Sequence, residues 1–324
     1  HVRSRRQRQM CIRDRPYSVF LEIFFKTKKN NKFKNPIILI ASKKLVIQQM
    51  KKLNFHFKIN LIDEKKTNFK KLNNKFINLI NVNFNFKKTF DKISDNSNSY
   101  IASCFQIALE ILKKNNCKGL INGPISKKNF LKKNFLGITE FLSNKVYKKN
   151  KVAMLIYNKK LSVSPITTHL PLKEVHKHIT KQKIINQAKL IKQFYKIKFN
   201  KNPKIAITGL NPHCESNYKS SEEDKIIKPA IKHLVKNRYK IEGPFAADTI
   251  FMKEKSKKFD VIIGMYHDQV LTPIKTLFGF NAINITLGLP FIRISPDHGP
   301  NTAMLGKNMS NPNSLIQALK FLDK

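Results

Sequence analysis

The chain contains no tryptophan, only ten glycines, and 20 acidic residues against 63 lysines and arginines. No glycines form a Gly-x-Gly-x-x-Gly motif, which excludes the standard dinucleotide-binding fingerprint of Rossmann domains. No run of 18 or more apolar residues occurs, so the sequence predicts no membrane-spanning helix. The four cysteines form no Cys-x-x-Cys pair, and no secretory signal pattern is present. This usage favours a reducing, cytoplasmic location.

The shortage of acidic residues leaves a formal net charge of +43, a value typical of proteins that bind nucleic acid or an anionic membrane. The lysines, however, are scattered over almost every polar stretch, and no aromatic-basic cluster interrupts them. Asn, Ile and Phe are also abundant, which is the usage that A/T-rich codons produce. We interpret the charge mainly as mutational bias on solvated surfaces, with nucleic-acid binding as the less favoured alternative.

The first fifteen residues differ in composition from the rest of the chain. Six of the eight arginines lie there, and the segment lacks apolar periodicity. We expect residues 1–15 to be a non-native or disordered head outside the fold. A basic targeting arm is the alternative.

Beyond the head, apolar β-branched runs alternate with amphipathic stretches of helical length. We expect strands at residues 35–42, 57–62, 118–122, 152–157, 161–167, 204–209, 260–265 and 282–287. We expect helices at residues 43–53, 97–115, 180–199, 220–237 and 314–322. This alternation predicts an α/β fold with mainly parallel sheets and helices on both faces. A chain of 324 residues is long enough for two lobes.

Three histidines, His169, His213 and His267, each lie near the end of an expected strand. Polar side chains at such ends surround ligands in α/β enzymes, and three imidazoles can bind a divalent ion while leaving positions open for substrate. A single histidine at a strand end is more often a hydrogen-bonded loop residue. Because these histidines form no short motif, their spacing alone leaves both interpretations open.

Seven segments resemble, in order and spacing, the 4-hydroxythreonine-4-phosphate dehydrogenase family of pyridoxal phosphate synthesis. They are Asn122-Gly123-Pro124-Ile125-Ser126-Lys127, Thr139-Glu140-Phe141-Leu142, Thr168-His169-Leu170-Pro171-Leu172, Gly209-Leu210-Asn211-Pro212-His213, Gly243-Pro244 with Ala247-Asp248-Thr249, Tyr266-His267-Asp268-Gln269, and Asn284 to Arg293 continuing to Asp297-His298-Gly299. The resemblance covers roughly residues 100–324. It implies a two-lobed fold similar to that of isocitrate and isopropylmalate dehydrogenases. Residues 16–125, completed by 282–324, would form the first lobe, and residues 126–281 the second, which carries the metal histidines.

The resemblance also implies the reaction. NAD, or NADP, would oxidise the hydroxyl of 4-phosphooxy-threonine, and the 2-amino-3-oxo acid would decarboxylate to 3-amino-2-oxopropyl phosphate. A divalent metal held by His169, His213 and His267 would favour loss of the hydroxyl proton. Zn²⁺ is the first expectation, with Mg²⁺, Mn²⁺ or Co²⁺ as alternatives. The family also implies a homodimer with shared active sites.

Four residues match substrate-binding positions of the family: Thr139, Lys275, Asn284 and Arg293. Arg293 is one of only two arginines outside the head, which indicates a bidentate anion contact that lysine cannot reproduce. A surface ion pair is the alternative interpretation of this arginine.

Asp248 and Asp268 are the candidate catalytic residues, for proton transfer or for orienting a ligating imidazole. Asp248 could equally be the N-cap of a helix at residues 249–255. The cofactor candidates are His298, Gly299 and Asn311, by resemblance to the wider isopropylmalate dehydrogenase group. We interpret Cys214, next to His213, as a packing residue.

The main departure from the family pattern is Ile138, which stands where the family has a histidine that contacts the substrate phosphate. This difference keeps a second enzyme open, a paralogue that oxidises threonate or erythronate 4-phosphate. A second departure lies near the start, where no Gly-Asp-Pro-type loop precedes Glu22. We therefore expect that the first strand of the sheet could be missing.

Overall fold

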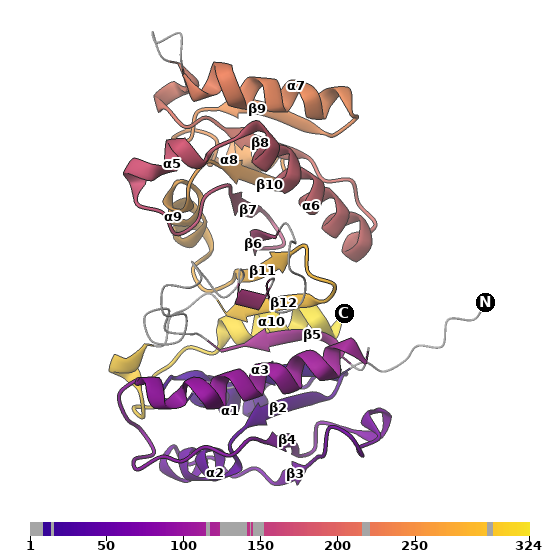
Figure 1. Ribbon diagram of the computed structural model, residues 1–324, viewed down its shortest axis with the longest axis vertical. Coiled ribbons are helices and arrows are strands. Elements are labelled where there is room, and N and C mark those ends of the chain that lie inside the picture. Colours follow the sequence, from indigo (N-terminus) through magenta and orange to yellow (C-terminus); the bar gives the residue numbers. More distant parts are fainter. Residues whose placement is uncertain are drawn as a thin grey trace, which may run out of the picture. The chain divides into compact units, whose positions relative to one another are not determined.

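The computed structural model describes residues 9–13, 16–114, 117–123, 141–142, 144, 152–215, 221–296 and 301–324. The chain forms two compact units, a first unit of His1–Ile138 with Pro290–Lys324 and a second unit of Thr139–Leu289 (Figure 1). The lobe boundaries expected from the sequence, after residues 125 and 281, lie earlier in the chain than the boundaries of these units, after residues 138 and 289. Within the described residues, no helix is long and apolar enough to cross a membrane.

The first unit contains a parallel sheet that is covered on both faces. Its strand order is β3-β4-β2-β1-β5-β12, and each neighbouring pair is parallel. The strands are β1 (Gln9–Arg13), β2 (Ile37–Ala41), β3 (Ile59–Leu61), β4 (Ile77–Asn81), β5 (Cys117–Asn122) and β12 (Ile292–Pro296). Every residue of β2 is buried. Since successive side chains of a strand point to opposite faces, both faces must be covered.

The helices of the first unit are α1 (Phe20–Asn30), α2 (Lys43–Lys52), α3 (Asn98–Lys113) and α10 (Asn313–Asp323). Helix α3 packs on β1, β2 and β5, whereas α10 packs on β1, β5 and β12. The apolar face expected for α3 is confirmed, with Ile101, Phe105 and Ala108 buried. Ser42 caps α2 by accepting a hydrogen bond from the Leu45 backbone N–H, which fixes where that helix begins.

The expectation that the whole Arg-rich head lies outside the fold is wrong for Gln9–Arg13. These residues form β1, which pairs with β2 on one side and β5 on the other. Met10, Cys11 and Ile12 are fully buried there, so a short apolar run outweighs the surrounding arginines. The expectation of a missing first strand is wrong for the same reason.

The second unit contains a mixed sheet of order β11-β6-β7-β10-β8-β9. Its strands are β6 (Ala153–Tyr157), β7 (Ser162–Pro165), β8 (Ile205–Thr208), β9 (Ile241–Phe245), β10 (Val261–Gly264) and β11 (Ile283–Leu287). Strands β7, β10, β8 and β9 are parallel, while β6 pairs antiparallel with both β7 and β11. The strands expected at residues 152–157 and 161–167 are confirmed as β6 and β7, as is the mainly parallel α/β class.

The helices of the second unit include α5 (Leu172–His178), α6 (Lys181–Phe199), α7 (Lys228–Lys236), α8 (Lys253–Ser256) and α9 (His267–Phe278). Helix α9 packs on β7 and β10, and its Val270, Leu271 and Ile274 join the buried core. The sequence did not predict α9 because Pro273 lies inside it, where proline normally disfavours a helix. It also did not predict β4, which lies within a Lys/Asn-rich stretch.

Candidate active site

The three histidines follow three adjacent parallel strands of the second unit. His169 follows β7, His213 lies in the 3-10 turn Pro212–Cys214 after β8, and His267 begins α9 directly after β10. Because the strand order is β7-β10-β8 and the strands are parallel, all three residues lie along the carboxyl edge of one sheet. Their predicted placement at strand ends is confirmed, and metal binding itself stays a prediction.

Two of these histidines contact each other, and two contact the candidate catalytic carboxylates. The ring centroids of His169 and His267 lie 5.7 Å apart. Nδ1 of His267 lies 2.8 Å from the Asp268 carboxylate, and Nδ1 of His213 lies 3.9 Å from that of Asp248. In the part of the chain that is described, no three His, Cys, Asp or Glu side chains are grouped closely enough to hold a metal ion.

A hydrogen-bond network ties the three strand ends together through the backbone of Met265. The Gln269 side-chain oxygen accepts from the Met265 N–H (2.7 Å) and from the Thr208 hydroxyl (2.9 Å), and its nitrogen donates to the Gly209 carbonyl (2.8 Å). The Thr167 hydroxyl donates to the Met265 carbonyl at 2.8 Å. The segments bearing His169, His213 and His267 are therefore cross-linked by neutral groups. Gln269 belongs to the motif Tyr266-His267-Asp268-Gln269, but its position in the sequence gives no sign of this bridging role.

The loop that carries His213 is held by a buried carboxylate. Glu223 is 1% exposed, and its Oε1 accepts from the backbone N–H groups of Leu210 (2.7 Å) and Asn211 (2.9 Å). Burial alone would raise the pKa of Glu223, but the hydrogen bonds from Asn211, with Leu210, outweigh it and lower that pKa. A Cβ at position 209 would lie 2.6 Å from the Cys214 sulfur and 2.9 Å from Glu223 Oε1, so a larger residue there would have to displace these side chains. The sequence predicted a helix over residues 220–237 but gave no sign that Glu223 contacts the loop after β8.

The backbone around His213 is strained. His213 and Cys214 have φ angles of 58° and 62°, in the left-handed region that costs non-glycine residues free energy. This turn presents the His213 side chain to solvent, 76% exposed, beside the 57% exposed Asp248. Burial raises the pKa of the Cys214 thiol, which supports its interpretation as a packing residue rather than a thiolate.

The alternative role of Asp248 as a helix N-cap is wrong. Helix α8 begins at Lys253 with Met252 at its N-cap position, whereas Asp248 lies in a turn after β9. The strand β9 pairs with β8, so Asp248 follows the same sheet edge as the histidines. Asp268 is 79% exposed in the first turn of α9, where it contacts His267. That contact fits the role of orienting an imidazole better than that of moving a substrate proton.

The candidate substrate residues occupy different environments. Arg293, on β12 of the first unit, is 1% exposed, and its Nε donates to the Asn122 side-chain oxygen at 2.6 Å. Its alternative interpretation as a surface ion pair is therefore wrong. In the second unit, the Asn284 side-chain oxygen on β11 is buried without a hydrogen-bond partner among the described residues, and Lys275 is exposed on α9. Thr139 and Ile138 lie outside the described residues.

Of the three cofactor candidates, only Asn311 lies within the described residues. Its side-chain oxygen accepts a hydrogen bond from the Asn313 backbone N–H at 2.9 Å, at the start of α10. His298 and Gly299 fall outside the described residues.

The fold belongs to the α/β class, with histidines along the carboxyl edge of a parallel sheet. A solved structure described as a putative 4-hydroxythreonine-4-phosphate dehydrogenase from Salmonella typhimurium matches with a TM-score of 0.83 and 24% identity, over 98% of both chains. A terephthalate 1,2-cis-dihydrodiol dehydrogenase from Burkholderia xenovorans LB400 matches with a TM-score of 0.63 and 18% identity, over 98% of this chain and 97% of that one. At these identities the likeness establishes the fold.

Sequence relatives identify the family. The family model described as "Pyridoxal phosphate biosynthetic protein PdxA" matches residues 32–322. The chain is 38% identical over 311 residues to the 4-hydroxythreonine-4-phosphate dehydrogenase of Sulfurihydrogenibium sp. (strain YO3AOP1), covering 94% of each. It is 33% identical over 315 residues to that of Aquifex aeolicus (strain VF5), covering 95% of each. The chain belongs to the PdxA family of pyridoxal phosphate biosynthetic proteins, as the seven motifs predicted.

Proposed function

We propose that this protein is a 4-hydroxythreonine-4-phosphate dehydrogenase of pyridoxal 5′-phosphate biosynthesis. It oxidises 4-phosphooxy-threonine with NAD, or NADP, to a 2-amino-3-oxo acid that loses CO₂ to give 3-amino-2-oxopropyl phosphate. The observation that carries the proposal is the 38% identity to a relative of that name across 94% of both chains. The histidines along one sheet edge support it, since this is where parallel α/β folds bind their ligands.

The chemistry of the donor set at this edge, three imidazoles beside two carboxylates, suits a divalent metal ion, although the described side chains are not grouped closely enough to hold one. His169 and His267 face each other at 5.7 Å between centroids, and Asp268 contacts one ring nitrogen of His267, which leaves the other to bind. We propose His169, His213 and His267 as the ligands, with Zn²⁺ first and Mg²⁺, Mn²⁺ or Co²⁺ as alternatives. When bound, the ion would supply positive charge that favours loss of the substrate hydroxyl proton.

The remaining candidate residues bind and orient the substrate in this proposal. Arg293 offers a charged planar donor for a phosphate or carboxylate, and the Asn122 contact fixes the orientation of that guanidinium. The buried Asn284 oxygen gains a hydrogen bond if a substrate donor approaches, and an unpartnered buried acceptor makes such a contact favourable. Lys275 and Thr139 complete the proposed set.

The proton chemistry falls to Asp248 in this proposal. Its exposed carboxylate lies 3.9 Å from His213 Nδ1 and is able to accept a proton at the histidine edge. Asp268 instead holds the tautomer and orientation of His267. The nicotinamide cofactor would be bound by the segment containing His298, Gly299 and Asn311. We further propose a homodimer with shared active sites and, from cysteine usage, a cytoplasmic location.

A threonate or erythronate 4-phosphate dehydrogenase is the second candidate, favoured by Ile138 in place of the family histidine. Turnover of both substrate types, with each dinucleotide and with a panel of divalent metals, tests the two assignments directly. The variant Ile138→His sharpens the test. If 4-phosphooxy-threonine is the substrate, an added hydrogen-bond donor to its phosphate should lower the Michaelis constant for this substrate roughly tenfold. Faster turnover of the sugar-acid phosphate, with no gain for the amino acid in the variant, would move the assignment to the paralogue.

A further inference from the structure

The segment of residues 301–311 in the first unit, called here the cofactor segment, is irregular and locally bonded. It contains one 3-10 turn, Thr302–Met304, and left-handed backbone at Asn301, Gly306 and Asn308. Its backbone hydrogen bonds run between near neighbours, for example from Met304 N–H to the Asn301 carbonyl at 3.0 Å. Such bonds shape the segment but do not attach it to the body of the unit.

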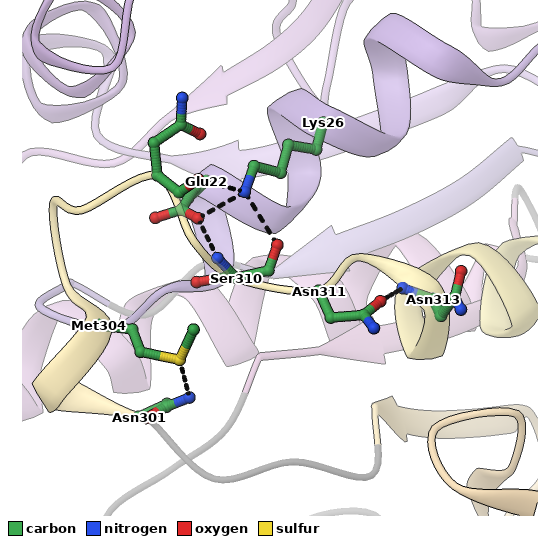
Figure 2. Close-up of polar contacts among 8 residues, drawn as sticks. Glu22, Lys26, Asn301, Met304, Ser310, Asn311 and Asn313 are labelled. Atoms are coloured by element: carbon green, nitrogen blue, oxygen red, sulfur yellow. Dashed lines mark hydrogen bonds and ion pairs between the residues drawn. The ribbon is translucent and has the colours of Figure 1, made fainter.

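Gly306 of the segment packs against the Phe90 ring, and the long-range hydrogen bonds come from two side chains of α1, nearly 300 residues earlier in the sequence (Figure 2). Glu22 Oε1 accepts from the Ser310 backbone N–H at 2.6 Å and from the Lys26 ammonium at 3.0 Å. The same ammonium donates to the carbonyls of Asn308 (2.8 Å) and Ser310 (2.9 Å). Together Glu22 and Lys26, called here the α1 clamp, engage both polar groups of the Ser310 backbone.

The clamp is desolvated, unlike the exposed helical ion pairs elsewhere in the described chain. The side chains of Glu22 and Lys26 are 2% and 19% exposed, compared with 73% for Glu254 on α8 and 60% for Lys257 directly after it. Charged hydrogen bonds strengthen when water is excluded. Glu22 Oε2 and Ser310 Oγ are buried without partners among the described residues.

The clamp ends one residue before the proposed cofactor contact. Ser310 directly precedes Asn311, whose side-chain oxygen is already fixed by the Asn313 N–H at 2.9 Å (Figure 2). A displacement of Ser310 would therefore carry Asn311 with it. A segment fixed before the ligand arrives binds more tightly than one that must be ordered on binding.

We propose that Glu22 and Lys26 are positioning residues for the dinucleotide, which hold the cofactor segment in the conformation that binds its adenosine half. The inference rests on the proposed function, because that function places a nicotinamide dinucleotide at Asn311. Neither residue touches the cofactor in this scheme. Both act through the backbone of Asn308 and Ser310.

The test compares Glu22→Gln and Lys26→Met with a matched control, Glu254→Gln, which breaks an exposed helical ion pair of the second unit. Binding of NAD and NADP to the full chain is measured by calorimetry, and hydrogen–deuterium exchange is followed in peptides covering residues 301–311. We expect both clamp variants to bind the dinucleotide roughly tenfold more weakly, the scale typical of residues that orient ligands from one step away. Exchange in the segment should quicken, and Lys26→Arg should restore part of the affinity.

Comparing dinucleotide affinity with turnover and with the Michaelis constant for the phosphorylated substrate distinguishes a positioning role from a general loss of structure. With saturating dinucleotide, turnover and the Michaelis constant for the phosphorylated substrate should stay within about twofold of wild type, since the interaction lost concerns cofactor binding alone. Unchanged dinucleotide affinity in both clamp variants would overturn the inference, whether or not exchange quickens. If the clamp variants bind the dinucleotide more weakly but the wild-type protein turns over neither phosphorylated substrate, the role of the clamp would stand and the proposed function would be refuted. A wild-type chain that binds neither dinucleotide would refute both.

Discussion

The edge that carries the histidines and the cofactor segment are held in place by different chemistry. At the edge, neutral groups of Gln269 and Thr167 join the ends of β7, β8 and β10, while the Glu223 carboxylate holds only the loop after β8. In the first unit, the charged pair Glu22–Lys26 holds the cofactor segment. Strand ends present backbone groups at fixed positions, so a single amide can bridge them. An irregular segment presents carbonyls in several directions, which suits the three rotatable donors of an ammonium.

The largest expected effect on turnover comes from removing a proposed metal ligand. Such a change leaves the Gln269–Thr167 network and the Glu22–Lys26 pair intact, so any loss of turnover reports on the metal site. His213→Ala should lower metal content and reduce turnover by roughly a hundredfold or more, a loss at least as large as that of an outer-shell partner. The unfolding midpoint should hardly change, since the His213 side chain is 76% exposed. Metal analysis and steady-state kinetics check this, with His56→Ala, an exposed histidine of the first unit, as the control. Wild-type turnover without bound metal would contradict the metal assignment.

Breaking the neutral network itself should have the next largest effect. Gln269→Leu removes the acceptor for Met265 N–H and Thr208 and the donor to Gly209. We expect unfolding to become easier by about 2 kcal/mol and metal affinity to fall roughly tenfold. Tyr195→Phe is the matched control, because its hydroxyl contacts Ser162, the first residue of β7, and the carbonyl of Asp260, just before β10, at the opposite ends of these strands. Equal loss of metal affinity in both variants would mean that stability alone explains the effect.

The third prediction concerns Arg293, a charged side chain whose orientation is fixed by the neutral amide of Asn122. Arg293→Lys would leave one point charge in place of a planar donor oriented by Asn122. The Michaelis constant for the phosphorylated substrate should rise about tenfold, while dinucleotide binding stays unchanged. Arg238→Lys, at an exposed arginine of the second unit, is the control. A variant that loses dinucleotide affinity instead would place Arg293 in the cofactor site.

The smallest expected effect concerns Glu223 and appears as a pH dependence. Its pKa is lower in the folded protein than the ordinary value of 4.5, so folding favours the ionised carboxylate. The resulting stability is fully present above about pH 4.5 and is lost as pH falls through the folded pKa.

Glu223→Gln should remove this pH-dependent part of the unfolding free energy. Urea unfolding at pH 7 and at pH 4 measures the unfolding free energy of both proteins. The difference in unfolding free energy between wild type and variant should be smaller at pH 4. Glu254→Gln provides an exposed control. A gap that stays constant would show that Glu223 acts through its shape rather than its charge.

Much of the fold followed from local patterns because those patterns also describe what is buried. The residues expected to form α3, α6, β6 and β7 do so, since their apolar spacing matches the period of each element. Elements whose local signals conflicted with their environment were missed. Helix α9 contains a proline, and β1 lies among arginines, yet both pack into the interior of their units.

The sequence by itself determined the family, the α/β class and the histidines at strand ends, because motifs and periodicity are properties of neighbouring residues. Only the tertiary structure decided what holds those residues. Glu223 reaches back to the amides of Leu210 and Asn211, Gln269 bridges β8 and β10, and Glu22 meets Ser310 from the other end of the chain. Contacts of this kind join residues that are distant in sequence, and their energy depends on burial and direction. No local pattern encodes either quantity.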